Sequence, residues 1–242
     1  MEDDFTIVWW EQRGAGMSYS PEIAPETLTP EQLIADTLEV TDYLRRRFGK
    51  DKLYLMGHSG GTFIGIQAAA QAPERYYAYI GVAQIANQLE SERLAHAYLL
   101  ERFRANRDSA MVRQLEAAPV TLADGAPDAY LAVRDEAMHR LGVGTTHNIR
   151  SVVDGLFLAS LQSRDYTLGE KVRLWRGKAS AGVSVLWQTM MTTDLATTVP
   201  ELDIPVYFFH GIYDYTCSYP LAKAYFEQLK APVKGFYRQE QS

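Results

Sequence analysis

The sequence contains a single cysteine, Cys217, so no intrachain disulfide can form. This excludes a disulfide-stapled scaffold, and one cysteine is in keeping with a reducing compartment. Long hydrophobic runs are missing too, since no apolar stretch is long enough to cross a bilayer. The first residues, Met1 to Asp4, are acidic rather than basic. We therefore expect neither a signal peptide nor a membrane anchor, and a cytoplasmic location.

Positive charge is also scarce, because 24 Lys and Arg stand against 30 Asp and Glu, for a formal net charge of −6. The sequence pI near 5.4 provides no basic footprint for nucleic acid or for acidic membranes, so neither is expected as a partner. With 47% hydrophobic and 22% charged residues over 242 positions, the composition is that of a soluble globular protein. Repeats and low-complexity tracts are lacking, and we expect one large α/β domain or a domain with an insertion.

Short apolar runs alternate with helical patterns in the first third of the chain. Residues Phe5–Trp10, Leu53–Met56 and Tyr79–Ala83 have the length and the β-branched and aromatic content of buried strands. Between the first two runs, Thr29 and Pro30 are typical of a helix N-cap and first helical position. This alternation predicts right-handed crossovers and a mainly parallel sheet, the α/β class.

A long helical block interrupts the alternation. From about Asn87 the pattern becomes predominantly helical, and a strand returns only at Pro205–Phe209. Ligands of parallel α/β folds bind outside the carboxyl ends of the strands, which such an inserted block can cover. We therefore expect an α/β core of residues 1–87 and 200–242, with a helical cap of residues 88–199.

The segment GHSGG at residues 57–61 follows the strand predicted at Leu53–Met56 and precedes a helical pattern. A G-x-S-x-G run between a strand and a helix places its serine, here Ser59, on a tight turn where the hydroxyl is exposed as a nucleophile. Small residues in the following helix, such as Gly65, let that helix lie close to a sheet. The alternative is an ordinary glycine-rich turn that binds an anion at a helix N-terminus. The order of strand, turn and helix favours the nucleophile elbow.

Three motifs together resemble a known family. Residues 10–18, WEQRGAGMS, resemble a D-Q-R-G-x-G-x-S loop, residues 57–61 a nucleophile elbow, and residues 210–214, HGIYD, an H-G-x-x-D strand end. In these motifs the chain is similar to the α/β-hydrolases, and among them to proline iminopeptidases, although Glu11 stands where those have Asp. The resemblance implies an α/β-hydrolase fold and a serine hydrolase that works through an acyl-enzyme on a small peptide or small acyl substrate, without cofactor or metal.

The same resemblance assigns roles to single residues. Ser59 is the expected nucleophile, and Asp214 is the expected acid that orients a histidine base. The backbone N–H of Gly60 is an expected oxyanion donor, the kind of group that stabilises a transition state by a few kcal/mol. The catalytic histidine follows the acid in this architecture, yet all five histidines precede Asp214. The resemblance therefore predicts that no catalytic histidine lies in this chain.

Other parts of the family pattern are also missing. No His-Gly-Gly-Pro-Gly-like loop, the source of the second oxyanion donor, precedes Phe5. The first three strands, and the last strand and helix, are expected to be absent, so the chain resembles a protein truncated at both ends. We expect a four-stranded sheet core in which Phe5–Trp10 pairs with Leu53–Met56 or lies beside a gap. Without base and second donor, most of the catalytic acceleration should be lost, because triad members act as a unit.

Three functions fit these residues. The first is a proline iminopeptidase-like aminopeptidase, and the second is an esterase, lactonase or amidase with the same chemistry, because one fold hosts many activities. The third is a non-catalytic fragment whose exposed sheet edges recruit another chain, and the oligomeric state is open. A peptidase needs an acidic group in the cap for the free amine of its substrate. Five cap residues could provide it: Glu90, Glu92, Asp135, Glu136 and Asp154.

Overall fold

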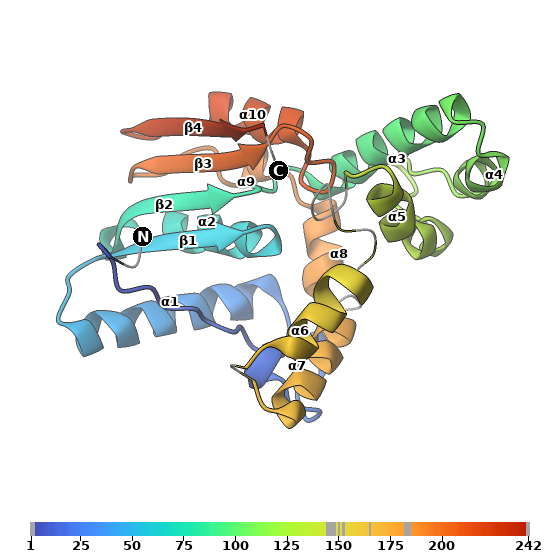
Figure 1. The fold of residues 1–242 in the computed structure, drawn as a ribbon. Helices are drawn as coiled ribbons and strands as arrows, with labels where there is room; N and C mark the ends of the chain where they lie inside the picture. The colour runs from blue at the N-terminus through green and yellow to red at the C-terminus, as the bar shows by residue number, and fades with distance from the viewer. Residues whose placement is uncertain are drawn as a thin grey trace.

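The computed structural model describes residues 3–143, 149, 151, 153–164, 166–181 and 185–240. Within these ranges four parallel strands form one sheet in the order β1-β2-β3-β4. The strands are β1 (Leu53–His58), β2 (Tyr76–Val82), β3 (Val206–Gly211) and β4 (Lys234–Gln239). Each strand thus pairs with the next one along the chain, through a crossover that runs back past the sheet (Figure 1). The expected α/β class with a parallel sheet is confirmed.

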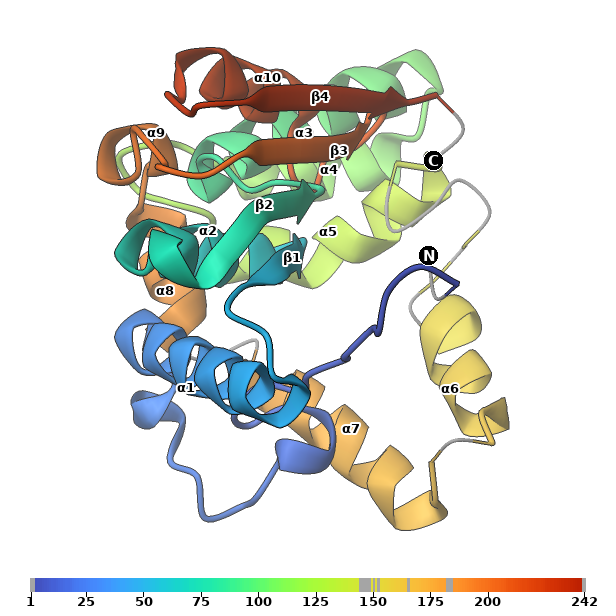
Figure 2. The ribbon, with the colours of Figure 1, turned by 90° about the vertical axis from the view of Figure 1, so that its left-hand side faces the viewer.

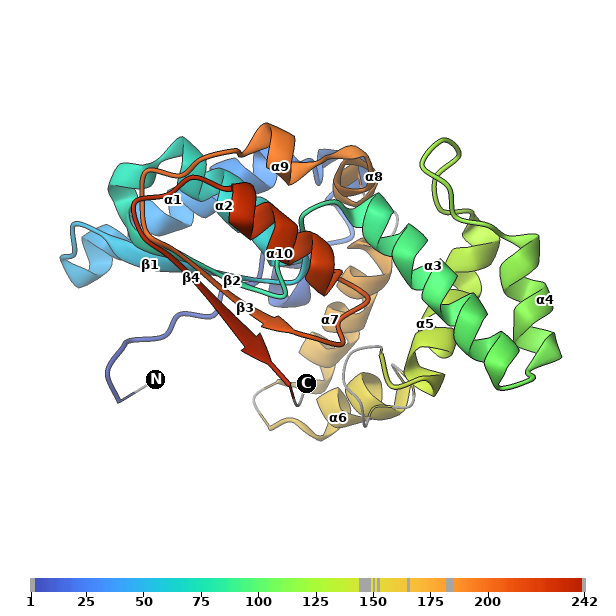
Figure 3. The same ribbon diagram turned by 90° about the horizontal axis from the view of Figure 1, so that it is seen from above.

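Helices cover one face of the sheet and the end at which its strands finish. One face carries α1 (Pro30–Phe48), α2 (Gly60–Gln71), α9 (Leu195–Thr198) and α10 (Tyr219–Gln228), as Figures 2 and 3 show. Past the arrowheads in Figure 1 lie α3 (Gln88–Ala105), α4 (Ser109–Ala117), α5 (Asp128–Arg140), the π-helical turn η4 (Val153–Phe157), α6 (Leu158–Gln162), α7 (Leu168–Ala181) and α8 (Val185–Thr192). Short 3-10 turns are η1 (Gly16–Ser18), η2 (Pro25–Thr27) and η3 (Pro73–Arg75). Among the described helices, none combines the length and the apolar character needed to span a bilayer.

Two separate clusters of buried side chains hold these layers together. The larger lies between the sheet and its helices and includes Ile66, Tyr79 and Phe208, each fully buried. The second is formed by α3, α4 and α5 around Leu99 and Leu115. The segment formed by α3, α4 and α5 therefore has a hydrophobic core of its own, which is what a structural unit needs to keep its shape beside a neighbouring core.

The start of α1 agrees with its sequence signals. The side chain of Thr29 accepts the N–H of Gln32 at 3.2 Å, and Pro30 is the first helical residue. Gly49 ends the helix with φ +61°, a left-handed conformation that glycine adopts without steric cost. Thr29 and Gly49 therefore fix both ends of the helix that lies next to α2.

Close approach of α2 to β1 depends on Gly57. A Cβ at this position would lie 2.7 Å from the carbonyl oxygen of Gly61 and 2.8 Å from Cα of Thr62. Further along α2, a Cβ on Gly65 would lie 3.2 Å from the ring of Tyr79 on β2. Gly61 differs, because a Cβ there meets nothing within 4 Å. Of the two outer glycines of the G-x-S-x-G run, only the first is required by packing.

The strand predicted at Phe5–Trp10 is wrong. Among the described residues this segment has no partner in the sheet, and Trp9 is 83% exposed. A ring contact with β1 places Phe5 edge-on to Tyr54, with centroids 5.6 Å apart. A β-branched and aromatic run forms a strand only where a neighbouring backbone accepts its hydrogen bonds, and β1 does not do so here. The count of four is met instead by β4, although the last strand was expected to be missing.

Replacing Gly57 by alanine should destabilise the protein by about 1–3 kcal/mol, because the new methyl group overlaps the backbone of α2. Gly61→Ala is the matched control, which should leave stability unchanged or raise it by about 0.5–1 kcal/mol, because alanine is the better helix former. Urea unfolding followed by circular dichroism measures both. Equal effects of the two substitutions would contradict the close packing of α2 on β1.

Candidate active site

Ser59 occupies the turn between β1 and α2 in a backbone conformation that is unusual for a residue with a side chain. Its φ is +50° and its ψ is −122°. Such a conformation costs of order 1–3 kcal/mol and persists only where the surroundings fix it. The Ser59 N–H donates to the carbonyl of Val82 on β2 at 2.9 Å. Its carbonyl accepts both the N–H of Thr62 at 2.8 Å and the Thr62 hydroxyl at 2.6 Å. The hydrogen bonds of the Ser59 backbone with Val82 and Thr62 therefore hold the serine in this conformation.

Thr62 connects this turn to the segment after β2. Its hydroxyl, which donates to the Ser59 carbonyl, also accepts the N–H of Ile85 at 3.0 Å, and the residue is fully buried. Gly60 follows Ser59 as the first residue of α2, so no carbonyl of that helix precedes its N–H. The backbone N–H of Gly60 thus lies at the positive end of a helix dipole, directly beside the serine.

Asp214 lies in the loop that follows β3. Its Oδ1 accepts two backbone N–H groups, those of Thr216 at 2.9 Å and Cys217 at 2.8 Å. Its own N–H donates to the carbonyl of Gly211 at 3.2 Å. Aspartate favours this local turn because its side chain replaces a backbone acceptor. One carboxylate oxygen is therefore used to shape the loop, while the side chain remains 18% exposed.

Cys217 brings the serine and the aspartate together. Its Sγ lies 3.8 Å from Oγ of Ser59, although the two residues are 158 positions apart, while its N–H is held by Asp214. Burial, and after it the charge of Asp214, raises the pKa of the thiol to about 12, so the sulfur is protonated. Cys217 is thus a neutral neighbour of the serine rather than a second nucleophile. The sequence analysis assigned Cys217 no role in the site. The available clue is that Cys217 lies three residues after Asp214, because an aspartate side chain in a turn often accepts the backbone N–H of a residue that closely follows it.

His210 stands behind Asp214 at the end of β3. Its Nε2 is 2.5 Å from the carbonyl of Cys217 and 3.6 Å from Oδ2 of Asp214, whereas its buried Nδ1 has no partner among the described atoms. Burial lowers the pKa of His210, and the opposing effects of Asp214 and of the Cys217 carbonyl are smaller. The neutral ring therefore donates from Nε2. Its polar contacts are with the loop and not with Ser59, as expected for a strand-end histidine.

The remaining histidines are also away from the serine. His96 contacts the carbonyl of Leu115 through Nε2 at 2.9 Å, and His139 contacts the carbonyl of Asp135 through Nδ1 at 2.6 Å. His58 is exposed, and His147 lies outside the described residues. In the ranges that the structure covers, no histidine is hydrogen-bonded to Ser59, and no group of three His, Cys, Asp or Glu side chains could hold a metal ion.

The acidic side chains considered for a substrate amine are mostly engaged by arginines. Glu92 is completely buried in a bidentate pair with Arg134, while the other pairs are nearer the surface. These are Glu90 with Arg93, Asp135 with Arg134 and Glu136 with Arg140. The side chain of Asp154 lies outside the described part. Glu92 also accepts from Gln88 and Tyr130, so its carboxylate is saturated by protein donors.

A serine on a strained turn between a parallel strand and a helix, with an aspartate on the loop after a later strand, is a geometry typical of α/β hydrolases. The family model described as alpha/beta hydrolase fold matches residues 2–167, more than half of the chain. The chain belongs to the α/β hydrolase fold family.

Individual relatives agree with this membership. The chain is 29% identical over 247 residues to the probable aminopeptidase YbaC of Bacillus subtilis (strain 168), covering all of this chain and 75% of the relative. A proline iminopeptidase-related protein from Thermus thermophilus superposes with a TM-score of 0.53 at 21% identity, over 95% of this chain and 70% of the other. The monoacylglycerol lipase of Paleococcus ferrophilus gives 0.51 at 14% identity, over the same two shares. The two structural likenesses show the shared fold.

Acid should destabilise the protein partly through His210. Because burial lowers its folded-state pKa, the unfolded chain binds the proton more readily, and stability is lost as the pH falls below the ordinary value of about 6.5. The free energy of unfolding in urea should therefore fall more between about pH 8 and about pH 5.5 in the wild type than in His210→Asn. The account of a buried neutral His210 would be wrong if both proteins lost the same amount.

Proposed function

We propose that this protein is a serine hydrolase in which Ser59 is the nucleophile, Asp214 is the acid and the N–H of Gly60 is an oxyanion donor. The observation that carries the proposal is the approach of Oγ of Ser59 to within 3.8 Å of Cys217, whose N–H is bound by Asp214. This contact joins the turn after β1 to the loop after β3 at the carboxyl end of the sheet, the place where α/β folds act on ligands.

The chemistry is acyl transfer in two steps. Oγ of Ser59 attacks a carbonyl carbon while a base takes the hydroxyl proton, and the proton then passes to the leaving amine or alkoxide as the acyl-enzyme forms. Water attacks the ester in the second step, and the same base takes and returns a proton. His210 is not this base, because its Nε2 is directed at the Cys217 carbonyl. We therefore expect the 242-residue chain, without an added base, to acylate slowly.

The proposed substrate is a small peptide with a free N-terminus, cleaved as by a proline iminopeptidase. Two observations support this choice: the probable aminopeptidase YbaC is a relative at 29% identity, and residues 10–18 resemble the corresponding loop. Helices α3 to α8, within residues 88–199, are the proposed cap that selects the substrate. Hydrolysis of small esters, lactones or amides is the competing assignment with the same catalytic groups, and it is separated by the assay below.

Fluorophosphonate labelling tests the nucleophile directly. Labelling of the chain alone should be slow, because none of the histidines that the structure describes is hydrogen-bonded to Ser59, and imidazole in the buffer should accelerate it by acting as the base. Ser59→Ala should abolish the labelling. Asp214→Asn should reduce the imidazole-dependent part, because the carboxylate no longer stabilises an imidazolium ion beside the serine.

Each outcome bears on a separate part of the proposal. Rapid stoichiometric labelling of Ser59 without imidazole would show that the chain supplies its own base. Labelling that survives Ser59→Ala would reject Ser59 as the nucleophile. With imidazole present, a panel of prolyl arylamides and short acyl esters then decides the substrate class, provided that the turnover disappears in Ser59→Ala.

A second candidate function is a binding module that associates through its sheet, and we propose a second copy of this chain as its partner. β1 is an edge strand of the described sheet, and an unpaired strand edge is a template for pairing with another chain. Large side chains on and beside β1 contribute apolar surface, among them Tyr54 and Met56, about half exposed. Sedimentation tests this: a dimer that Met56→Lys dissociates supports it, and a monomer at all concentrations rejects it.

A further inference from the structure

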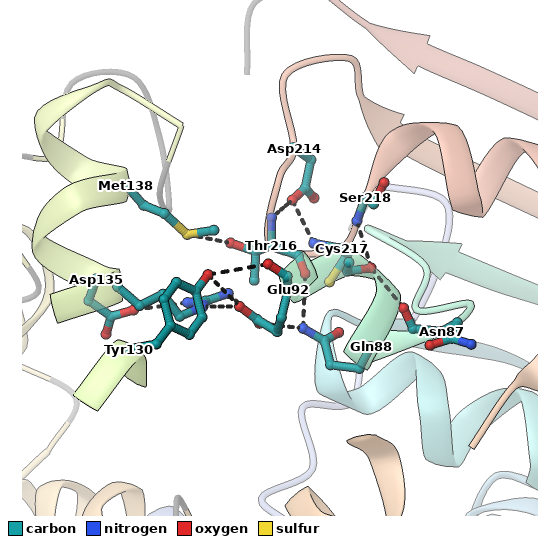
Figure 4. Close-up of polar contacts among 12 residues, drawn as sticks. Asn87, Gln88, Glu92, Tyr130, Asp135, Met138, Asp214, Thr216, Cys217 and Ser218 are labelled. Carbon is teal, nitrogen blue, oxygen red and sulfur yellow. Dashed lines mark hydrogen bonds and ion pairs between the residues drawn. The ribbon is translucent and has the colours of Figure 1, made fainter. Parts of the chain in front are cut away.

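Side chains of α3 form hydrogen bonds with the loop that carries Asp214. Gln88, in the first turn of that helix, donates from Nε2 to the carbonyl of Thr216 at 3.0 Å (Figure 4). One turn further on, Oγ of Ser91 accepts the N–H of Ser218 at 3.3 Å. The loop therefore receives polar contacts from α3 on both sides of Cys217, the residue that faces Ser59.

All three polar groups of Thr216 are fixed by other residues. Its N–H donates to Oδ1 of Asp214, its carbonyl accepts from Gln88, and its hydroxyl donates to the sulfur of Met138 on α5 at 3.8 Å. The peptide unit between Thr216 and Cys217 thus connects Gln88 to the carboxylate of Asp214, because its carbonyl accepts from Gln88 and its N–H, that of Cys217, donates to Oδ1 of Asp214. A shift of the Gln88 amide would rotate this peptide, and with it the Cys217 N–H that orients Asp214.

Gln88 is itself held by a buried ion pair between α3 and α5. Its Nε2 also donates to Oε1 of Glu92 at 2.8 Å. Arg134 donates to the same carboxylate from Nε at 2.5 Å and from Nη2 at 2.8 Å. The hydroxyl of Tyr130 adds a contact with Glu92 at 3.1 Å (Figure 4). Burial opposes the charge of Arg134, but Glu92 outweighs it and raises the pKa of the guanidinium, so the pair stays ionised.

Two neighbouring acceptors fix the orientation of the Gln88 amide, and this orientation leaves its oxygen atom without a partner among the described residues. Both acceptors around it, a carboxylate and a carbonyl, require the NH₂ group on that side. Its Oε1 is consequently buried without a partner among the described residues. A buried acceptor left unpaired is unfavourable. The two contacts of the NH₂ group, with Glu92 and with the Thr216 carbonyl, therefore outweigh the unpaired oxygen.

We infer that Gln88 is a positioning residue for Asp214, and that the Glu92–Arg134 pair holds Gln88 in place. This inference rests on the proposed function for its catalytic consequence, while its structural part stands by itself. The helices α3 and α5 thereby do more than cover the strand ends, because they set the direction of the Asp214 side chain through the peptide between Thr216 and Cys217.

Hydrogen exchange of the two amides bound by Asp214 reports on its carboxylate without any activity. In Gln88→Met, which keeps the volume but removes the donor, the amides of Thr216 and Cys217 should exchange about tenfold faster, as expected for loss of one hydrogen bond. Amides of β3 and the thermal unfolding temperature should stay near wild type. Gln114→Met, at an exposed position of α4, is the control for the substitution itself.

Arg134→Lys gives a second, milder change, since it keeps the charge but loses the two-pronged contact with Glu92. It should accelerate the same two amides. Arg93→Lys makes the same change in the more exposed Arg93–Glu90 pair of α3 and should leave both amides as they are. Unchanged exchange of Thr216 and Cys217 in Gln88→Met, or equal acceleration across β3 and α10, would overturn the inference.

Labelling of Ser59 with imidazole separates this inference from the proposed function. Gln88→Met should lower the imidazole-dependent rate, and adding Gln88→Met to Asp214→Asn should lower it no further, because both act through the same carboxylate. Fully additive effects would contradict a positioning role. If the wild type is not labelled at Ser59 at all, the proposed function fails, while the exchange of Thr216 and Cys217 still decides the structural part.

Discussion

The strained turn at Ser59 is the constraint on which the rest of this site depends. A residue with a side chain holds φ at +50° only because Val82 and Thr62 bind its backbone and because Gly57 lets α2 approach β1. The turn directs the hydroxyl toward the sulfur of Cys217, on a loop that comes from the far end of the sequence. The Ser59 hydroxyl, the N-terminus of α2 and the Asp214 loop are therefore brought together by one piece of local backbone geometry.

The second requirement is a fixed carboxylate at Asp214. One of its oxygens is used by two backbone N–H groups, which leaves the other oxygen, 3.6 Å from the buried neutral His210, as the one not committed to the turn. Gln88 on α3 is hydrogen-bonded both to this loop and to Glu92, which forms a buried ion pair with Arg134 on α5. Removing one partner of such a pair leaves an uncompensated buried charge, which is strongly destabilising. Helices α3 and α5 are thereby connected to the Asp214 loop by a continuous set of hydrogen bonds.

The sequence was sufficient to predict the features that are set by local rules. The strand–turn–helix at Ser59, the Thr29 cap and the parallel sheet all follow from short-range patterns in the sequence. The catalytic roles of Ser59 and Asp214 stay predictions. Phe5–Trp10 failed as a strand because pairing depends on a neighbour that no local pattern specifies. Gln88 and Cys217 were not found for a related reason: their roles arise from contacts over more than 120 positions of the chain.

Trapping the contact between the turn and the acid loop tests this account most directly. Ser59→Cys creates a protein with two thiols, and the second, Cys217, has its sulfur 3.8 Å from the replaced oxygen. Refolding in a glutathione redox buffer and counting free thiols by alkylation and mass spectrometry shows whether they join. The account predicts an intramolecular disulfide between residues 59 and 217. Two freely alkylated thiols would contradict the juxtaposition of Ser59 and the Asp214 loop.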